Sequence, residues 1–352
     1  MEIKKFINKK PYIISGPCSA ESEEQLLNTA KSLKGKINVF RAGVWKPRTK
    51  PNSFEGVGKE ALFWLQKVQN ETGLKVITEV ATAKHVELCL NAGIDMLWIG
   101  ARTTVNPFYV QEISEALSGV NIPVFVKNPI HPDISLWIGA LERLNNKGIT
   151  KLSAIHRGFF TYESSAFRNE PKWELPIELK RKLPDLPIIC DPSHISGNRK
   201  LIGDISQTAM DLDMNGLMIE SHINPKKALS DVNQQLTPTE LQNLLDSLIY
   251  RKRKSEDEKI LSELKYLREK IDTIDEGIVS VLKNRKQFVE EIAQIKLKHN
   301  VTIFQLERWF QILNSRQRQA TEIGLDPKMI SDIYKLIHKY SILTQSKIMR
   351  KD

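Results

Sequence analysis

The 352-residue sequence has few cysteines, few aromatic residues and no long apolar segment. The three cysteines, Cys18, Cys89 and Cys190, are too few for a disulfide framework, which indicates the reducing cytoplasm. No segment approaches the ~18 uninterrupted apolar residues of a membrane helix. The N-terminal segment MEIKKFINKK also lacks the apolar stretch that follows the lysines of a secretory signal. We therefore expect a cytoplasmic protein with no membrane partner.

The formal net charge of +10 is distributed unevenly along the chain. The basic excess is mild over most of the chain and dense only at Arg251–Lys254, the tetrapeptide RKRK. A nucleic-acid-binding protein would gather basic residues on one surface together with aromatic residues. We therefore expect no nucleic-acid partner, and we interpret the tetrapeptide as part of a solvated linker.

The first 250 residues alternate short β-rich runs with longer helical segments. This alternation is typical of a parallel sheet, and eight such units in about 250 residues predict a (β/α)₈ TIM barrel. A doubly wound open sheet is the alternative, but no G-x-G-x-x-G motif follows the first strand. The predicted strands are Tyr12–Ser15, Val39–Ala42, Lys75–Glu79, Met96–Ile99, Val124–Lys127, Leu152–His156, Ile188–Cys190 and Gly216–Glu220.

After Ser255 the pattern becomes helical. Apolar residues from Glu258 to Leu297 mostly recur at three- or four-residue steps, and no proline interrupts them. A second helical stretch covers Leu306 to about Thr321. A third begins at Asp326-Pro327, with Asp as the N-cap and Pro at the first helical position. The sequence therefore predicts an all-α three-helix domain after the barrel.

These patterns predict a barrel domain over residues 1–250, a linker over 251–257 and a helical domain over 258–352. The first predicted helix would be roughly 60 Å long at ~1.5 Å per residue. Two shorter helices cannot cover the apolar stripe along that length. We therefore expect a homodimer that forms through the helical domain.

In a (β/α)₈ enzyme the functional groups lie at the C-terminal ends of the strands. Nearly every predicted strand ends in a reactive or charged group, so these groups converge on one site. Its cations can hold at least two anionic groups. Its thiolate, imidazole and carboxylates suit a divalent transition metal, which could activate a carbonyl. The cations are Arg41, Lys46, Arg48, Arg102, Lys127 and Arg157; the metal-ligand candidates are Cys18, His194, Glu220 and Asp231; Glu79 is a substrate-site residue or orients a ligand.

The motifs ISGPCSAE, RAGVWKPRTKPNSFEG, IGARTT, HRGF, CDPSHISG, MIESH and ALSDVNQQLT carry a family resemblance. Over about residues 10–250 they resemble 3-deoxy-D-arabino-heptulosonate 7-phosphate (DAHP) synthase of the compact type I-beta subgroup. The resemblance implies a divalent metal ion of the Mn, Fe, Co or Zn class. It implies Cys18, His194, Glu220 and Asp231 as its ligands, and Arg41, Lys46, Arg102, Lys127 and Arg157 around phosphoenolpyruvate.

The motif KPRT at Lys46–Thr49 separates two related activities. The heptulosonate enzymes have this motif, and the resemblance implies that Arg48 and Thr49 hold the phosphate of erythrose 4-phosphate. The sister octulosonate synthases have a different motif there, so that alternative is disfavoured. In the implied reaction the metal polarises the aldehyde and the methylene carbon of phosphoenolpyruvate attacks it. Water then adds at C2, phosphate leaves, and the cations keep both substrates in register.

Polar residues also lie on one side of the predicted helices. Arg285 and Lys296 are 11 residues apart and therefore within about 20° on a helix at ~100° per residue. Ser341 and Gln345 are neighbours at i and i+4 on the third helix. These residues indicate either an anion site inside the bundle or ordinary solvated surface charges.

The segments LKYLREKIDTIDEGIVSVLKNRKQFVEEIAQIK, LERW and SILTQ resemble the all-α (AroQ-type) chorismate mutases across residues 258–347. The resemblance implies rearrangement of chorismate to prephenate without an acid, base or nucleophile. It also implies that Arg268 acts in the partner subunit's site. Trp309 and Gln305 depart from the family pattern, which often has a carboxylate after the Arg of the second helix. The implied site residues are Arg268, Arg285, Lys296, Arg308, Ser341 and Gln345.

The two resemblances together indicate a bifunctional shikimate-pathway enzyme. Trp309 keeps an alternative open, in which the helical domain mainly senses chorismate or prephenate and regulates the barrel. Only about ten residues precede the first strand, so the appended domain is the candidate regulatory element. We expect chorismate or prephenate to inhibit DAHP synthesis through it.

Overall fold

The computed structural model describes residues 1–8, 11–46, 53–162 and 165–350. The chain divides into two compact units, Met1–Arg253 and Lys254–Asp352, which we describe separately. Within the described ranges, no helix combines the length and the apolar character needed to cross a membrane.

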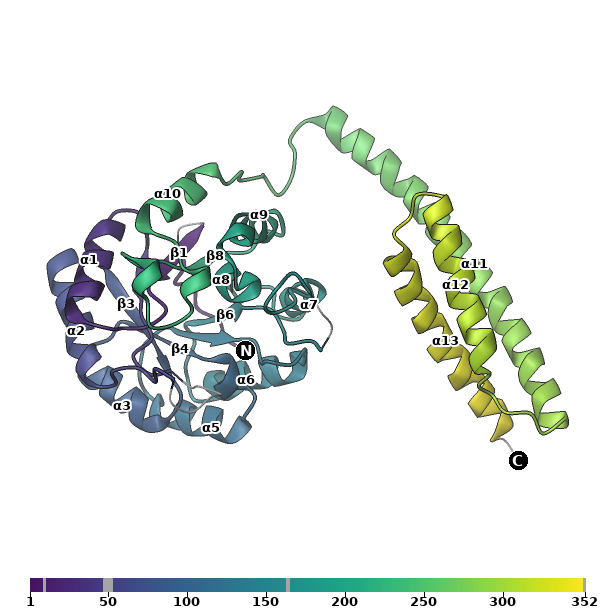
Figure 1. The fold of residues 1–352 in the computed structure, drawn as a ribbon, viewed down its shortest axis with the longest axis horizontal. Helices are drawn as coiled ribbons and strands as arrows, with labels where there is room; N and C mark the ends of the chain where they lie inside the picture. Colours follow the sequence, from purple (N-terminus) through teal and green to yellow (C-terminus); the bar gives the residue numbers. More distant parts are fainter. Residues whose placement is uncertain (9–10, 47–52, 163–164, 351–352) are drawn as a thin grey trace. The chain divides into compact units, whose positions relative to one another are not determined.

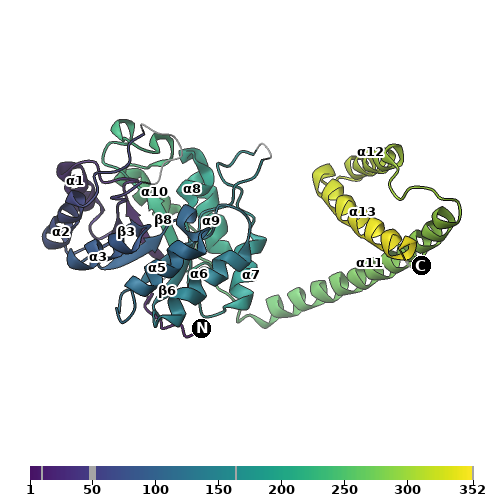
Figure 2. The ribbon, with the colours of Figure 1, turned by 90° about the horizontal axis from the view of Figure 1, so that it is seen from below.

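The described residues of the first unit contain eight parallel strands that pair in chain order and close into a barrel, β8 against β1. The predicted TIM barrel is therefore confirmed, and the open-sheet alternative is wrong. Figures 1 and 2 show the helices surrounding the strands. The strands are β1 (Tyr12–Gly16), β2 (Val39–Arg41), β3 (Lys75–Val80), β4 (Met96–Ile99), β5 (Val124–Lys127), β6 (Leu152–His156), β7 (Ile188–Cys190) and β8 (Gly216–Glu220).

Local signals set the ends of the barrel helices. The side chains of Ser22, Thr82 and Asp133 each accept a hydrogen bond from the backbone of the first turn and so begin α1, α3 and α6. Gly73, at φ 73°, ends α2 in the left-handed conformation. The helices are α1 (Glu23–Leu33), α2 (Glu60–Thr72), α3 (Ala83–Asn91), α4 (Ala101–Thr104), α5 (Pro107–Ala116), α6 (Ile134–Asn146), α7 (Glu174–Lys182), α8 (Pro192–Ser196), α9 (Ile202–Asp211) and α10 (Pro238–Ser247).

The strands alternate between two cores. One apolar cluster fills the barrel interior, and a larger one lies between the strands and the helices. Because side chains alternate faces along a strand, the residue two positions after an interior apolar residue also points inward. At the C-terminal ends this next inward residue is charged: Val39 is followed by Arg41, Ile77 by Glu79, Phe125 by Lys127 and Met218 by Glu220.

The end of β1 depends on a glycine. Gly16 has φ 149°, and a Cβ atom there would lie 2.1 Å from the carbonyl oxygen of Arg41. Any larger residue would push β2 away from β1. Gly16 therefore lets the chain turn sharply to Cys18 while Arg41 stays directly beside it.

The second unit consists, in its described residues, of α11 (Glu258–Lys298), α12 (Leu306–Glu322) and α13 (Pro327–Met349). The predicted three-helix architecture is thus confirmed. The side chains of Asp257 and Asp326 cap α11 and α13, the latter before Pro327. Helix α13 packs against both α11 and α12. In both views the first part of α11 extends beyond the other two helices (Figures 1 and 2).

Hydrogen bonds and ion pairs connect the C-terminal segment of the barrel unit to α9 and the residues just after it. The amide of Gln207 donates to the carbonyl of Ile249 and accepts from its N–H, both at 2.9 Å. Arg251 forms an ion pair with Asp211, at the end of the same helix. Arg253 likewise pairs with Asp213 at 2.5 Å. The basic tetrapeptide therefore begins on the surface of the barrel.

Candidate active sites

A cavity of about 520 Å³ opens at the C-terminal ends of the strands and collects most of the predicted barrel residues. Glu79 and Lys127 reach it from strand ends, and Arg157 follows β6 directly. The other predicted residues come from the loops and short helices that follow the strands. The cavity lining includes Lys46, Glu79, Arg102, Lys127, Arg157, His194 and Asp231.

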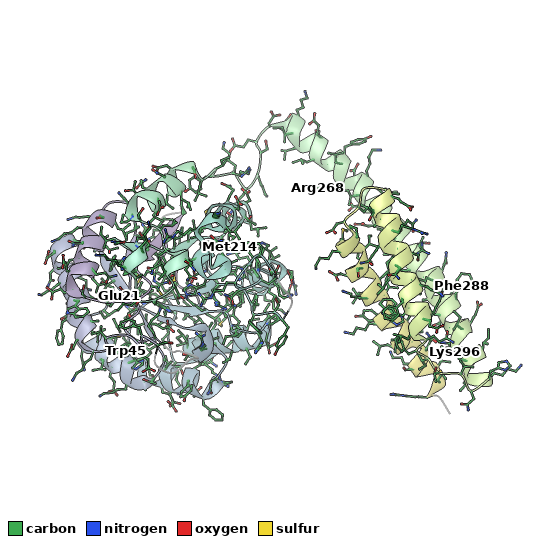
Figure 3. All side chains as sticks on the ribbon, in the orientation of Figure 1. Glu21, Trp45, Met214, Arg268, Phe288 and Lys296 are labelled. Atoms are coloured by element: carbon green, nitrogen blue, oxygen red, sulfur yellow. The ribbon has the colours of Figure 1, made fainter. Side chains whose placement is uncertain are left out.

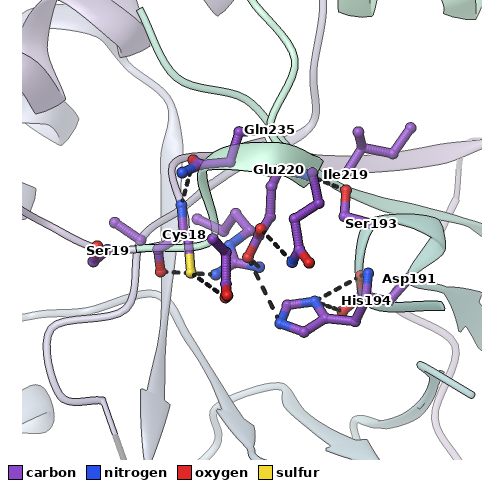
Figure 4. Close-up of polar contacts among 12 residues, drawn as sticks. Cys18, Ser19, Asp191, Ser193, His194, Ile219, Glu220 and Gln235 are labelled. Atoms are coloured by element: carbon purple, nitrogen blue, oxygen red, sulfur yellow. Dashed lines mark hydrogen bonds and ion pairs between the residues drawn. The ribbon is translucent and has the colours of Figure 1, made fainter. Parts of the chain in front are cut away.

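Three of the predicted metal ligands form one group beside this cavity. The ligand atoms of Cys18, Glu220 and Asp231 all lie within 4.8 Å of one another. The fourth, His194, places Nε2 3.7 Å from Oε1 of Glu220. Figure 4 shows Cys18, Glu220 and His194 pointing toward one another from different elements. The four side chains thus approach a common point from four separate parts of the chain.

The donor atoms in this group suit a divalent transition metal. They combine a thiolate sulfur, carboxylate oxygens and an imidazole nitrogen. The buried Oε1 atom of Glu220 accepts no hydrogen bond from the described residues, although it lies 3.2 Å from Nη1 of Arg41 in an ion pair. Its lone pairs are therefore available to a cation. Asp231 lies at φ 49°, an unusual backbone conformation that recurs at functional sites.

Asp191 orients the imidazole of His194. It caps the short helix α8 by accepting from the backbone N–H of His194, and its Oδ2 lies 2.9 Å from Nδ1 of the same residue. With Nδ1 occupied, Nε2 is the ring nitrogen directed at Glu220. Lys127 holds Asp191 in turn, with Nζ 2.8 Å from Oδ2. Asp191 is therefore a positioning residue that follows directly on a predicted strand.

Charge and burial set the protonation of this group. Burial, with the neighbouring Glu220, raises the pKa of Cys18 to about 12. A metal ion binding the sulfur would therefore displace a proton. Burial lowers the pKa of His194, which favours the neutral ring that a metal needs. Burial acts to raise the pKa of Asp231, but His194 and Arg168 outweigh it and hold that pKa below its usual value.

Three arginines make the cavity strongly cationic. Burial lowers the pKa of Arg157 to about 10, and the charges of Arg168 and Arg102 act in the same direction. Arg157 also donates to Asn169 at 2.8 Å, which fixes its direction. A buried guanidinium with two further arginines near it favours an anion such as a phosphate in this cavity.

Arg168 was not among the predicted site residues. It lines the cavity and donates to Oδ1 of Asp231 at 3.0 Å and to Oε1 of Gln234 at 2.7 Å. It lies in the long loop after β6, so the expectation that functional groups follow strand ends directly could not identify it. The HRGF motif marks the start of this loop, which is the one sequence signal that pointed toward it.

Arg41 lies beneath the cavity rather than on its lining. It is 1% exposed, pairs with Glu220 and donates to the carbonyl of Cys18 at 3.1 Å. Its guanidinium carbon lies 4.8 Å from the ring centroid of Trp98. In this arrangement Arg41 holds two of the candidate metal ligands in position.

Lys46 and Glu79 flank the cavity on other sides. Lys46 places Nζ 2.9 Å from the sulfur of Cys18 and so lies between the cavity and the candidate metal ligands. Glu79 accepts from the indole N–H of Trp98 at 3.1 Å. Arg48 and Thr49 of the KPRT motif lie outside the described residues.

In the helical unit, Arg285 on α11 and Ser341 on α13 are brought into direct contact. Nη1 of Arg285 donates to Oγ of Ser341 at 2.7 Å. Both residues line a largely apolar cavity of about 440 Å³ between these two helices. A fixed cation in an apolar cavity provides a site for an anionic ligand.

The other predicted residues of this unit differ in placement. Lys296 donates to the carbonyl of Ile303 at 2.6 Å, Arg308 is exposed, and Gln345 is buried. Arg268 and Lys296 lie toward opposite ends of α11 (Figure 3). At ~1.5 Å per residue, Arg268 is about 25 Å from Arg285 along the helix axis. A single small ligand therefore cannot reach both arginines of one chain.

The fold and the first cavity define a class of barrel enzyme. A closed barrel that directs cations and metal-binding side chains into one cavity suits the binding of phosphorylated substrates beside a metal ion. Residues 2–255 match the model of the DAHP synthetase I family, and residues 267–346 match that of chorismate mutase type II. The chain belongs to the DAHP synthetase I family. That family depends on a divalent metal ion, and the group of Cys18, Glu220 and Asp231 fits one.

Relatives of known name agree with this assignment. A phospho-2-dehydro-3-deoxyheptonate aldolase of Thermotoga maritima is 36% identical over 225 residues, or 64% of each chain. The crystal structure of the DAHP synthase of that organism superposes with a TM-score of 0.61 at 32% identity and covers 67% of each chain. A 2-dehydro-3-deoxyphosphooctonate aldolase of Vesicomyosocius okutanii is 27% identical over 274 residues, 69% of this chain and 91% of that one.

Proposed function

We propose that the protein is a bifunctional enzyme of the shikimate pathway. The barrel condenses phosphoenolpyruvate with erythrose 4-phosphate to DAHP and phosphate. The helical domain rearranges chorismate to prephenate. The observation that supports the first activity best is the single cavity in which Lys46, Arg102, Lys127 and Arg157 face the candidate metal ligands.

Different barrel residues bind the phosphate and neutralise charge during the condensation. Arg102 and Arg168 each repel Arg157, so a bound phosphate relieves that repulsion and is held firmly. Lys46 neutralises charge at the junction between this cationic region and the sulfur of Cys18. Two substrates that are fixed in register avoid most of the entropic cost of meeting.

A divalent ion held by Cys18, His194, Glu220 and Asp231 would supply Lewis-acid polarisation of the aldehyde oxygen. The protein's part is to hold those ligands ready. Asp191 fixes the ring of His194, and Arg41 fixes Glu220. Metal analysis of the purified protein will show whether it binds Mn, Fe, Co or Zn.

The preferred aldehyde substrate is tested by comparing the rates with two candidate aldehydes. The heptonate aldolase shares 36% identity with this chain, against 27% for the octonate aldolase. The KPRT motif favours the same four-carbon substrate. Phosphate release from phosphoenolpyruvate should be at least ten times faster with erythrose 4-phosphate than with arabinose 5-phosphate. The opposite preference would replace the proposal with the octulosonate synthase.

The mutase activity is supported by the contact of Arg285 with Ser341. Arg285 can bind a carboxylate of chorismate, and a fixed cation beside the breaking ether bond stabilises the developing negative charge. Disappearance of chorismate in the presence of the full-length protein tests this. A protein that binds prephenate but leaves chorismate unchanged would support the sensing alternative, which Trp309 keeps open.

We propose that the helical domain forms a homodimer. Large apolar side chains along α11 are exposed, including Ile274 at 63%, Ile278 at 52% and Phe288 at 63%. A second copy would cover them. It would also bring the partner's Arg268 to the site. The Arg268 of the same chain is too far along α11 to reach it. Sedimentation equilibrium should show a dimer, and a monomer at micromolar concentration would contradict the proposal.

We also propose feedback control. Chorismate or prephenate bound to the helical domain would favour one state of the enzyme and lower the rate of DAHP synthesis. Initial rates of the synthase with increasing prephenate test this, and unchanged rates at saturating prephenate would contradict it.

A further inference from the structure

One histidine of α13 lies among the proposed mutase residues without having been assigned a role. His338 precedes Ser341 by three residues and Gln345 by seven. At ~100° and ~1.5 Å per residue, His338 and Gln345 differ by about 20° around the helix and lie about 10 Å apart along it. The three side chains therefore form one polar stripe on α13, and Arg285 contacts its middle member.

The ring of His338 is held by aromatic side chains. It stacks on Trp309 of α12 with the ring centroids 4.0 Å apart and the planes 12° apart. Phe304, just before α12, packs at a centroid distance of 5.9 Å. A stacked ring of this kind keeps its edge, and the nitrogen on that edge, in a fixed direction. Trp309, which departs from the mutase pattern, thus holds the ring of His338 in place.

Both ends of the polar stripe lack a partner. Nε2 of His338 and Oε1 of Gln345 are buried, and neither makes a hydrogen bond with the described residues. Among the described residues of the helical unit, these are the two buried side-chain nitrogen or oxygen atoms that lack a hydrogen-bond partner. Unpaired buried polar atoms are costly, and two on one face beside a fixed arginine indicate a ligand that pairs with both.

We propose that His338 is a substrate-binding residue of the mutase site, and that its Nε2 accepts a hydrogen bond from the ring hydroxyl of chorismate. This inference rests on the proposed mutase function. The carboxylates of the ligand require cations, which Arg285 and its basic neighbours supply. A neutral acceptor at the end of the stripe suits the remaining polar group, the hydroxyl.

The surroundings keep the imidazole neutral. Burial lowers the pKa of His338, and the positive charge of Arg285 on α11 lowers it further. Helix α12 faces it with Trp309 and the preceding segment with Phe304, neither of which titrates there. On α13 itself the neighbouring Lys335 and Lys339 are exposed. The ring is therefore uncharged near pH 7, and with the proton on Nδ1 its Nε2 is an acceptor.

Two substitutions separate the hydrogen bond from the stack. His338→Phe keeps an aromatic ring against Trp309 but removes Nε2. His338→Gln loses the ring but keeps an acceptor at nearly the same distance from the backbone. In the full-length protein, His338→Phe should raise KM for chorismate roughly tenfold, as expected for one lost hydrogen bond in a buried site. His338→Gln should recover part of that loss.

The pH profile gives an independent reading. In the parent protein, kcat/KM for chorismate should fall as acid protonates His338, and this decline should be absent from His338→Phe. The control is His299→Gln, a change at the exposed histidine that ends α11, which should leave both measurements unchanged. Circular dichroism and DAHP synthesis verify that each variant is folded.

The outcomes are distinct. If the parent rearranges chorismate and His338→Phe has parental KM and parental pH dependence, His338 is not a substrate-binding residue. If His338→Phe does not fold, His338→Gln decides: a near-parental KM without the acid decline supports the proposal, and an unchanged acid decline in that variant overturns it. If the parent neither rearranges chorismate nor binds prephenate by calorimetry, the proposed function itself fails.

Discussion

The barrel and the helical unit support their functional charges in different ways. In the barrel, Arg41, Lys127 and Glu220 are buried at 5% exposure or less, at strand ends that hydrogen bonds hold in register. In the helical unit, Arg268 and Arg308 are exposed, and so are apolar residues along α11. Eight strands converge on one point within a single chain, whereas three helices leave a long face open. The barrel site is thus supplied by one chain, and the helical site calls for a second.

The largest expected effect is in the barrel. Cys18→Ala should reduce DAHP formation by more than about a hundredfold, because it removes a ligand from the candidate metal group. Chorismate rearrangement should be unchanged, because it takes place in the other unit. Both activities are measured on the same preparation. A chelator should act in the same way, and a divalent ion should reverse it.

The matched control for this change is Cys89→Ala. Cys89 is also fully buried, but it lies in α3 among apolar side chains. It should retain nearly full synthase activity. If both alanine variants lose activity equally, the loss reflects packing, and the metal assignment of Cys18 fails.

The next effect is in the helical unit. Arg285→Ala should lower the rate of chorismate rearrangement by about a hundredfold, because it removes a fixed cation from the site. The synthase should keep its turnover. Lys283→Ala, an exposed neighbour on the same helix, is the control. Chorismate consumption at the parental rate by Arg285→Ala would mean that the site lies elsewhere.

A deletion tests whether the two units communicate. Removing residues 256–352 should abolish inhibition of DAHP synthesis by chorismate or prephenate. It should also convert the dimer to a smaller species, as measured by sedimentation. Inhibition that persists in the deletion variant would place the effector site in the barrel.

The smallest effect concerns a buried histidine of the barrel. Burial lowers the pKa of His156 to about 3, below the value of about 6.5 expected in the unfolded chain. The folded ring stays neutral while the unfolded ring takes up a proton, so the barrel should lose stability as pH falls from about 6.5 toward 3. The slope is at most about 1.4 kcal/mol per pH unit.

His156→Phe should weaken that dependence, because phenylalanine fits the same aromatic surroundings without titrating. Trp137 and Trp173 pack near the ring and report unfolding by fluorescence. Urea midpoints at pH 7 and pH 5 are compared for the two proteins. An equal drop in both would assign the acid sensitivity to other groups.

Much of the fold could be predicted because short-range signals and long-range packing agree. Five of the predicted strand ranges match the observed bounds, and the other three, at β1, β2 and β3, each differ by one residue at the C-terminal end. The helix ends follow side-chain caps such as Asp133 and Asp326, which are visible in the sequence.

The site was less predictable where it depends on tertiary placement. Arg168 reaches Asp231 from a loop, and no periodicity places a loop residue. Arg41 follows the strand-end pattern, yet it lies under the cavity because alternation fixes the face of a side chain and not its depth. The stack of His338 on Trp309 joins two helices, so neither residue signals the other along the chain.

The closure of β8 on β1 bears on how the protein is made. The hydroxyl of Ser15 in β1 donates to the carbonyl of Ile219 in β8, 204 residues later. At about 5–20 residues per second, a ribosome needs roughly ten seconds or more to supply that partner. During this interval one edge of the first strand remains open to other chains, a recognised route to aggregation. Chaperones that shield nascent chains should therefore affect the yield of this protein most strongly before its eighth strand emerges.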